Sequence, residues 1–304
     1  MINVKRRSAD ASARSSFNID LLPYALVAPL TIFIIGLALV PAGFTIIESF
    51  FRVQPLNPPT AFSGLENFRN LIHDPNVIAS LNNTLLYIFF GVALSTILGI
   101  YMAILLQRKF SGRSILIAIL ILPWALPGVV EGILWTGIWD GNSGVLNSLL
   151  KSMHMISHYQ VFLGQNRLLT IFAIELVQVW QMTPLSTLLI LAALQNIPHD
   201  VYEAAKIDGS GPVRTFLHIT LPLVRPGIAI AMVQATIATL NIFDQPYILN
   251  GAATTGVSLS MKTYFISFQN LDFGEGYAIS LLITLFTLFV ALFVVRVVYR
   301  KVEY

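Results

Sequence analysis

The sequence predicts an all-α integral membrane protein with six transmembrane helices. Hydrophobic residues make up 56% of the 304 residues and charged residues only 11%, whereas a soluble domain has roughly 45–50% apolar and about 25% charged residues. The apolar residues form continuous runs rather than alternating with polar ones, which favours helices over a β-barrel. This balance excludes a disordered chain, and a net charge of +3 is too small to indicate binding to nucleic acid.

Six segments are long and uncharged enough to cross a bilayer, which takes about 20 mainly apolar residues. They are 21–47, 75–107 (apolar from residue 81), 114–139, 168–197, 226–243 and 276–295. The first run is longer than the roughly 7–15 apolar residues of a signal-peptide core, so an uncleaved helix is expected. We therefore predict an N-terminal tail over 1–20 and a single transmembrane domain over 21–304.

The distribution of Lys and Arg predicts that both termini are cytoplasmic, because basic residues are retained on that side. With the N-terminus inside, the inner segments hold Lys5, Arg6, Arg7, Arg14, Arg108, Lys109, Arg113, Lys206, Arg214, Arg225, Arg296, Arg300 and Lys301. The outer segments hold Arg52, Arg69, Lys151, Arg167 and Lys262. This orientation leaves 198–226 as the one substantial inner loop.

Motifs for catalysis are missing from the sequence. It contains no Gly-Lys pair for a phosphate-binding loop, no His-Glu-x-x-His helix and no Gly-x-Ser-x-Gly elbow. We therefore expect no catalytic residue, no metal site and no enzymatic activity in this chain.

The inner loop 198–226 is predicted to hold two short helical pieces. Asp200 is expected to cap the first, with Glu203 at the spacing of a capping box. Pro212 suits the first turn of the second piece, which Leu221-Pro222 is expected to end. Such a helix pair suits docking to a soluble partner, and an ordinary cytoplasmic loop is the alternative.

Within this loop Glu203-Ala204-Ala205 is followed after three residues by Gly209 and, nine residues later, by Ile219-x-Leu221-Pro222. This spacing, with Asp208, resembles the coupling-loop signature of binding-protein-dependent ABC importer permeases. Other segments are similar to the carbohydrate-uptake branch of that family: Phe62-x-Gly64-Leu65-x-Asn67-Phe68, Leu122-Pro123, Leu194-Gln195-x-Ile197-Pro198 and Phe243-Asp244-x-x-Tyr247. Residues 250–256 depart from the branch's usual Thr-Gly-Gly-Gly-Pro run.

The resemblance implies the type I ABC importer permease fold in a bacterial or archaeal cell membrane. It also implies the partners: a second permease subunit, two ATPase subunits or a homodimeric ATPase, and an extracytoplasmic solute-binding protein. ATP and Mg would be bound by the ATPase, so no cofactor is expected in this chain. The residues implied to couple to the ATPase are Glu203, Ala204, Ala205, Asp208 and Gly209.

The substrate implied by the resemblance is a sugar, with a di- or oligosaccharide preferred. Glycerol phosphate or a glycerophosphodiester is the alternative, although no Lys or Arg lies mid-membrane to attract an anion. Polar residues within or beside the spans are candidates for the transport path, because they are expensive in a bilayer. They are Glu131, Glu175, Gln178, Trp180, Gln181, Asn241, Asp244 and Gln245.

For each of these candidates, bonding or packing between helices is the competing interpretation. Glu131 lies between Gly128 and Gly132, a Gly-x-x-x-Gly spacing that allows close helix approach. Two other function classes also stay open: a self-sufficient secondary transporter or channel, and a membrane-embedded enzyme that uses Glu131 and Glu175. Co-purification of an ATPase and a second permease would separate an importer subunit from both.

Overall fold

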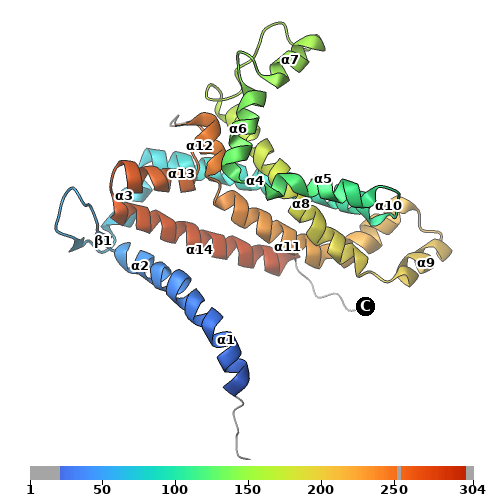
Figure 1. The fold of residues 1–304 in the computed structure, drawn as a ribbon, viewed down its shortest axis with the longest axis horizontal. Coiled ribbons are helices and arrows are strands. Elements are labelled where there is room, and N and C mark those ends of the chain that lie inside the picture. Colours follow the sequence, from blue (N-terminus) through green and yellow to red (C-terminus); the bar gives the residue numbers. More distant parts are fainter. Residues whose placement is uncertain (1–20, 252–254, 299–304) are drawn as a thin grey trace, which may run out of the picture. The chain divides into compact units, whose positions relative to one another are not determined.

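The computed structural model describes residues 21–251 and 255–298 of the chain (Figure 1). The chain divides into two compact units, one ending at Phe44 and the other beginning at Thr45. The predicted tail, residues 1–20, lies outside the described residues. The division into a tail and a single transmembrane domain therefore stays a prediction.

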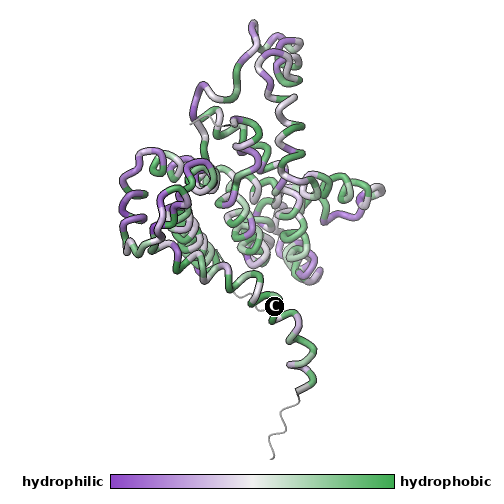
Figure 2. Tube along the Cα trace, turned by 60° about the vertical axis from the view of Figure 1, so that its left-hand side comes forward, coloured by the Kyte–Doolittle hydropathy of each residue, from purple (hydrophilic) through white to green (hydrophobic). Residues whose placement is uncertain are grey.

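The first predicted span is helical throughout its described length. It comprises α1 (Leu21–Ile34), a π-helical turn η1 (Ile35–Leu39) and α2 (Val40–Glu48). Residues 22–48 are long and apolar enough to cross a membrane, and Figure 2 shows hydrophobic residues along this helix. This agrees with the uncharged run 21–47.

Four long helices form the centre of the second unit. They are α4 (Pro75–Gln107), α8 (Arg167–Gln195), α11 (Leu221–Leu240) and α14 (Phe273–Val298). α4 packs against α8, and α11 contacts α4, α8 and α14. Small residues allow this close packing: a Cβ atom added at Gly99 of α4 would lie 2.9 Å from the Cβ of Ser186 on α8.

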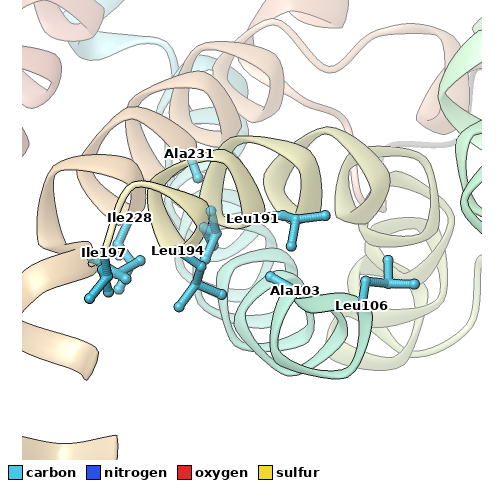
Figure 3. Packing of buried hydrophobic residues seen from close by; sticks show 9 residues of the cluster. Ala103, Leu106, Leu191, Leu194, Ile197, Ile228 and Ala231 are labelled. Carbon is cyan, nitrogen blue, oxygen red and sulfur yellow. The ribbon is translucent and has the colours of Figure 1, made fainter. Parts of the chain in front are cut away.

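One cluster of buried apolar side chains joins three of these helices where α8 approaches the inner loop. Figure 3 shows how these side chains interlock: Ala103 and Leu106 from α4, Leu191 and Leu194 from α8, Ile197 beyond it, and Ile228 and Ala231 from α11. The described residues include five helices that could each cross a membrane, or six spans if the bent pair described next is counted as one.

The third predicted span, 114–139, is wrong as a single helix. It consists of α5 (Arg113–Ala125) and α6 (Gly128–Trp139), which are bent by 99° relative to each other. Leu126 and Pro127 between them are extended, with ψ angles of 140° and 139°. The helical conformation is disfavoured for a residue that precedes proline, so Leu126 is a position at which the helix can break.

The predicted inner loop is shorter than 198–226. Its elements are α9 (His199–Ile207), α10 (Pro212–Thr215) and the π-helical η2 (Phe216–Thr220), which leads into α11. Leu221-Pro222 does not end the second helix: the chain is continuously helical over 212–240. Pro222 has no N–H, and its ring crowds the preceding turn of a helix. The wider π-helical turn η2, in which the Leu221 N–H donates to the Phe216 carbonyl, gives this ring the room it needs.

The segments that connect the long helices carry short elements of their own. They are β1 (Phe51–Arg52), β2 (Ala61–Phe62), α3 (Glu66–His73), α7 (Val145–Ser152), α12 (Asp244–Asn250), α13 (Leu259–Tyr264) and the π-helical η3 (Phe265–Gln269). β1 and β2 pair antiparallel, with Phe51 opposite Phe62. Hydrophilic residues gather in these connections, for example around α7 (Figure 2).

Candidate functional site

The first candidate site is α9, the short helix of the inner loop. It begins at His199 after Pro198, and no side chain caps its first turn. The predicted cap at Asp200 is wrong, because the helix starts at His199, two residues earlier than that cap requires, and Asp200 already lies inside the first turn. In the first turn the Asp200 carboxylate still stabilises α9, because it interacts favourably with the positive N-terminal end of the helix dipole. Glu203 instead pairs with His199 one turn before it, at 3.2 Å from Nδ1 to Oε1.

The end of α9 is fixed by the backbone. The Ser210 N–H donates to the Ala205 carbonyl at 2.9 Å, and the Gly209 N–H donates to the Lys206 carbonyl at 3.0 Å. This is the Schellman arrangement, which needs a left-handed residue just after the helix. Gly209 supplies it with a φ of +73°. The chain therefore leaves α9 in a defined direction.

The surface of α9 is only partly the one that the sequence predicts. Glu203, Ala204, Asp208 and Gly209 are exposed, but Ala205 is buried with 4% of its surface exposed. Ile207 was missed by the sequence reasoning, although its side chain is 86% exposed. The signal was present, because an apolar residue lies between a lysine and an aspartate at the tip of a polar loop. Charged and apolar groups are thus presented together.

The second candidate site is a cavity of about 360 Å³ between α6, α8, α11 and α12. Five of the eight predicted path residues line it: Gln178, Gln181, Asn241, Asp244 and Gln245. The remaining lining residues, which the sequence did not single out for the path, are Gly128, Met182, Ala238, Ile242 and Phe243. Amides, a carboxylate and one aromatic ring therefore face a common space.

Glu131 lies next to this cavity and is completely buried. Its Oε2 accepts a hydrogen bond from Gln245 Nε2 at 3.2 Å, and the same nitrogen lies 3.4 Å from Gln181 Oε1. Its Oε1 has no hydrogen-bond partner among the described residues. The carboxyl group thus joins α6 to the amide groups of the cavity.

The glycines beside Glu131 make the close approach that their spacing predicts. A Cβ atom at Gly132 would lie 2.7 Å from the Cβ of Ile248 on α12, and one at Gly128 would lie 2.9 Å from the Cβ of Asp244. The packing of these glycines and the hydrogen bond to Gln245 are both contacts between helices, while contact of Glu131 with a substrate stays a prediction.

Two predicted path residues lie elsewhere. Glu175 is fully buried between helices, and neither carboxyl oxygen has a hydrogen-bond partner within the described part of the chain. A Cβ atom at Gly91 of α4 would meet this carboxyl group. Trp180 turns away from the amide groups and packs its ring edge-on against Trp135, with 5.7 Å between the ring centres. Neither Glu175 nor Trp180 lines the 360 Å³ cavity.

Comparison with known families identifies the architecture. The model of the family described as "Binding-protein-dependent transport system inner membrane component" matches residues 95–304. The chain belongs to this family. The resemblance found in the coupling-loop signature is confirmed, and this permease is a multi-pass membrane component of a transport system.

Curated relatives of the permease cover nearly its whole length. It is 35% identical to the trehalose/maltose transport system permease protein MalF of Thermococcus litoralis, over 92% of this chain and 93% of the relative. It is 31% identical to the sn-glycerol-3-phosphate transport system permease protein UgpA of Yersinia enterocolitica, over 97% and 99%. The sulfoquinovosyl glycerol transport system permease protein SmoG of Agrobacterium fabrum is also 31% identical, over 85% of each chain.

Solved structures show the same fold. A chain of a bacterial ABC transporter involved in the import of the acidic polysaccharide alginate superposes with a TM-score of 0.78 at 21% identity, covering 93% of the permease and 97% of that chain. The alginate transporter in complex with its pentasaccharide-bound periplasmic protein gives 0.77 at 20% identity, covering 91% and 93%. The predicted type I ABC importer permease fold is confirmed.

Proposed function

We propose that the permease passes a neutral sugar, a di- or oligosaccharide, from an extracytoplasmic solute-binding protein across the membrane. The observation that carries the proposal is the lining of the 360 Å³ cavity. Amide groups can donate to and accept from sugar hydroxyls, a carboxylate can accept from them, and the ring of Phe243 can contact the CH groups of a pyranose. The name of the trehalose/maltose relative supports the same substrate class.

The competing substrate is glycerol phosphate, which the UgpA relative supports by its name. The charges of the cavity favour the neutral sugar. Asp244 is one of its lining residues, Glu131 adjoins it, and no Lys or Arg is among the described residues that line it. A phosphate group would face acidic side chains there, which is unfavourable in a partly dehydrated site.

The energy source in this proposal is ATP bound with Mg by a separate ATPase, while this chain binds no cofactor. α9 is the part that would contact the ATPase, through exposed Glu203, Ala204, Asp208 and Gly209 with Ile207 beside them. Buried Ala205 would support the helix from within rather than touch the ATPase. A second permease subunit would complete the path.

The proposed orientation places α9 and both termini in the cytoplasm. Its support is the excess of Lys and Arg on that side, because basic residues are retained there. In this orientation α9 faces the compartment that contains ATP.

The test is reconstitution of the importer into proteoliposomes with its binding protein. Uptake of labelled trehalose, maltose and glycerol phosphate is measured for the wild type, for Gln181→Leu in the cavity and for Gln269→Leu as an exposed control. The expected result is sugar uptake that Gln181→Leu lowers and Gln269→Leu does not. Uptake of glycerol phosphate alone would overturn the sugar assignment. Purification of an active transporter without an ATPase would favour a secondary transporter instead.

A further inference from the structure

A second cavity, of about 540 Å³, lies among the first turns of α4, the start of α8 and the segment 255–265. Its described lining consists of Asn76, Ala79, Ser80, Asn83, Arg167, Thr255, Gly256, Val257, Lys262 and Phe265. It shares no lining residue with the amide-lined cavity. Unlike that cavity, it contains two basic side chains.

Arg167 is held in this cavity by a neutral partner. Its Nε donates to Asn83 Oδ1 at 2.8 Å, and Asn83 Nδ2 donates to the Val257 carbonyl at 2.9 Å. Asn83 is 2% exposed, so this arrangement is well packed. Within the described part of the chain Arg167 makes no ion pair. The guanidinium is therefore oriented while its terminal nitrogens remain available for an anion.

Two further groups complete the polar lining. Lys262 has a side chain that is 15% exposed, and its Nζ lies 3.4 Å from Asp74 Oδ2. Ser80 is 2% exposed, and its hydroxyl makes no side-chain hydrogen bond to any described residue. Asp74 pairs with Lys262, and Glu275 also interacts electrostatically with this lysine, so the uncompensated positive charge of the cavity is that of Arg167, with the Ser80 hydroxyl as an additional donor.

Helix length indicates the depth of this cavity in the bilayer. α4 has 33 residues, so at 1.5 Å per residue it is about 50 Å long, about 20 Å more than the hydrocarbon core. Its strongly apolar part begins at Leu85, after Asn82, Asn83 and Thr84, which leaves Asn76, Ser80 and Asn83 in the polar excess. α8 also starts at this level, because its first residue is Arg167. The cavity therefore lies at the depth of the lipid headgroups.

We propose that this cavity binds the phosphate group of an anionic phospholipid between Arg167 and Lys262. Phosphate oxygens match the fork of donors on a guanidinium, and the distribution of Lys and Arg assigns Arg167 and Lys262 to the outer side of the membrane, where the headgroups of the outer leaflet lie. Ala79, Val257 and Phe265 give the cavity an apolar side for the glycerol end of the lipid. A free phosphate ion has the same charge chemistry, but the depth of the site favours the lipid.

The test uses the whole purified importer and native mass spectrometry with added phosphatidylglycerol, phosphatidylcholine or inorganic phosphate. Arg167→Gln removes the cation, and Arg167→Lys keeps the charge but loses the fork. Lys151→Gln is the matched control, an exposed basic residue outside the cavity. Thermal unfolding shows that each variant is folded.

The expected result is that Arg167→Gln weakens phosphatidylglycerol binding about fivefold, Arg167→Lys weakens it less, and Lys151→Gln leaves it unchanged. Unchanged binding in folded Arg167→Gln and Arg167→Lys would overturn the site. Equal retention of phosphatidylglycerol and phosphatidylcholine, with phosphate bound in an Arg167-dependent way, would overturn the lipid as ligand. Loss of binding-protein-stimulated ATP hydrolysis with unchanged lipid binding would overturn the proposal in favour of a protein contact.

Discussion

Replacement of Gly209 by valine is expected to uncouple the importer without removing it from the membrane. Gly209 has a φ of +73°, and a Cβ atom added there meets nothing within 4 Å. The cost is therefore conformational, roughly 1–2 kcal/mol for an L-residue forced into the left-handed region. That corresponds to about a 5- to 30-fold lower population of the native turn. We expect uptake to fall by up to this factor, because the chain then leaves the end of α9 in a different direction and α9 is no longer held in its native position.

The same loop provides two matched controls. Gly211 has a φ of −71° and open space around it, so Gly211→Val is expected to retain wild-type uptake. Gly209→Asn is expected to recover most of the loss, since asparagine tolerates the left-handed conformation. The assay is uptake and binding-protein-stimulated ATP hydrolysis by the assembled importer in proteoliposomes. Equal activities of Gly209→Val and Gly211→Val, at equal amounts in the membrane, would refute the reasoning.

Three further predictions concern packing, the cavity and pH. Gly91→Ala is expected to lower the melting temperature in detergent, because its methyl group would clash with the buried Glu175 carboxyl group on α8. The control Gly137→Ala lies in open space and should leave the melting temperature unchanged. Equal decreases in the two variants would contradict this explanation. Gln245→Leu removes the amide that donates to Glu131. We expect sugar uptake to be lost and the free energy of unfolding to fall by about 0.6–1.7 kcal/mol. Normal uptake in this variant would place the transport path elsewhere. The backbone N–H groups of Ser143 and Asn142 donate to the Asp140 carboxylate and hold its pKa below the ordinary value. The charged form of Asp140 therefore stabilises the fold at neutral pH. In melting curves from neutral pH to about pH 3, the advantage over Asp140→Ala should vanish as the pH falls through that lowered pKa, and a constant difference would argue against it.

The long helices could be predicted from the sequence because a bilayer imposes a simple requirement on them. A mainly apolar run of sufficient length has to be helical in a bilayer, and this predicted α4 and α8 within a few residues of their ends. The bend at Leu126-Pro127 was not predicted, because proline also occurs inside membrane helices, as Pro184 does in α8. Whether a proline breaks a helix depends on neighbouring packing, which a single sequence does not contain.

In the candidate sites too, features set by the local sequence could be predicted, and features set by packing between distant segments could not. Gly209 could be assigned because the demand for a left-handed residue is local. The separation of Glu175 from Gln178 could not, although the two are one turn apart on the same helix. Gly91 on another helix receives the Glu175 carboxyl group, while Gln178 faces the cavity. Which neighbour each side chain meets is decided by contacts between segments far apart in the sequence.

The unbroken helix over 212–240 connects the inner loop directly to the amide-lined cavity. It runs from the turn that follows α9 to Asn241, which lines the amide-lined cavity immediately after its last residue. The 20 residues of α11 that follow η2 are about 30 Å long, so a tilt of about 5° at η2 moves the far end of the helix by about 3 Å. η2, at the α9 end, is the irregular point about which such a tilt can occur. A small displacement of the inner loop would thus change the width of the amide-lined cavity with no flexible segment between them.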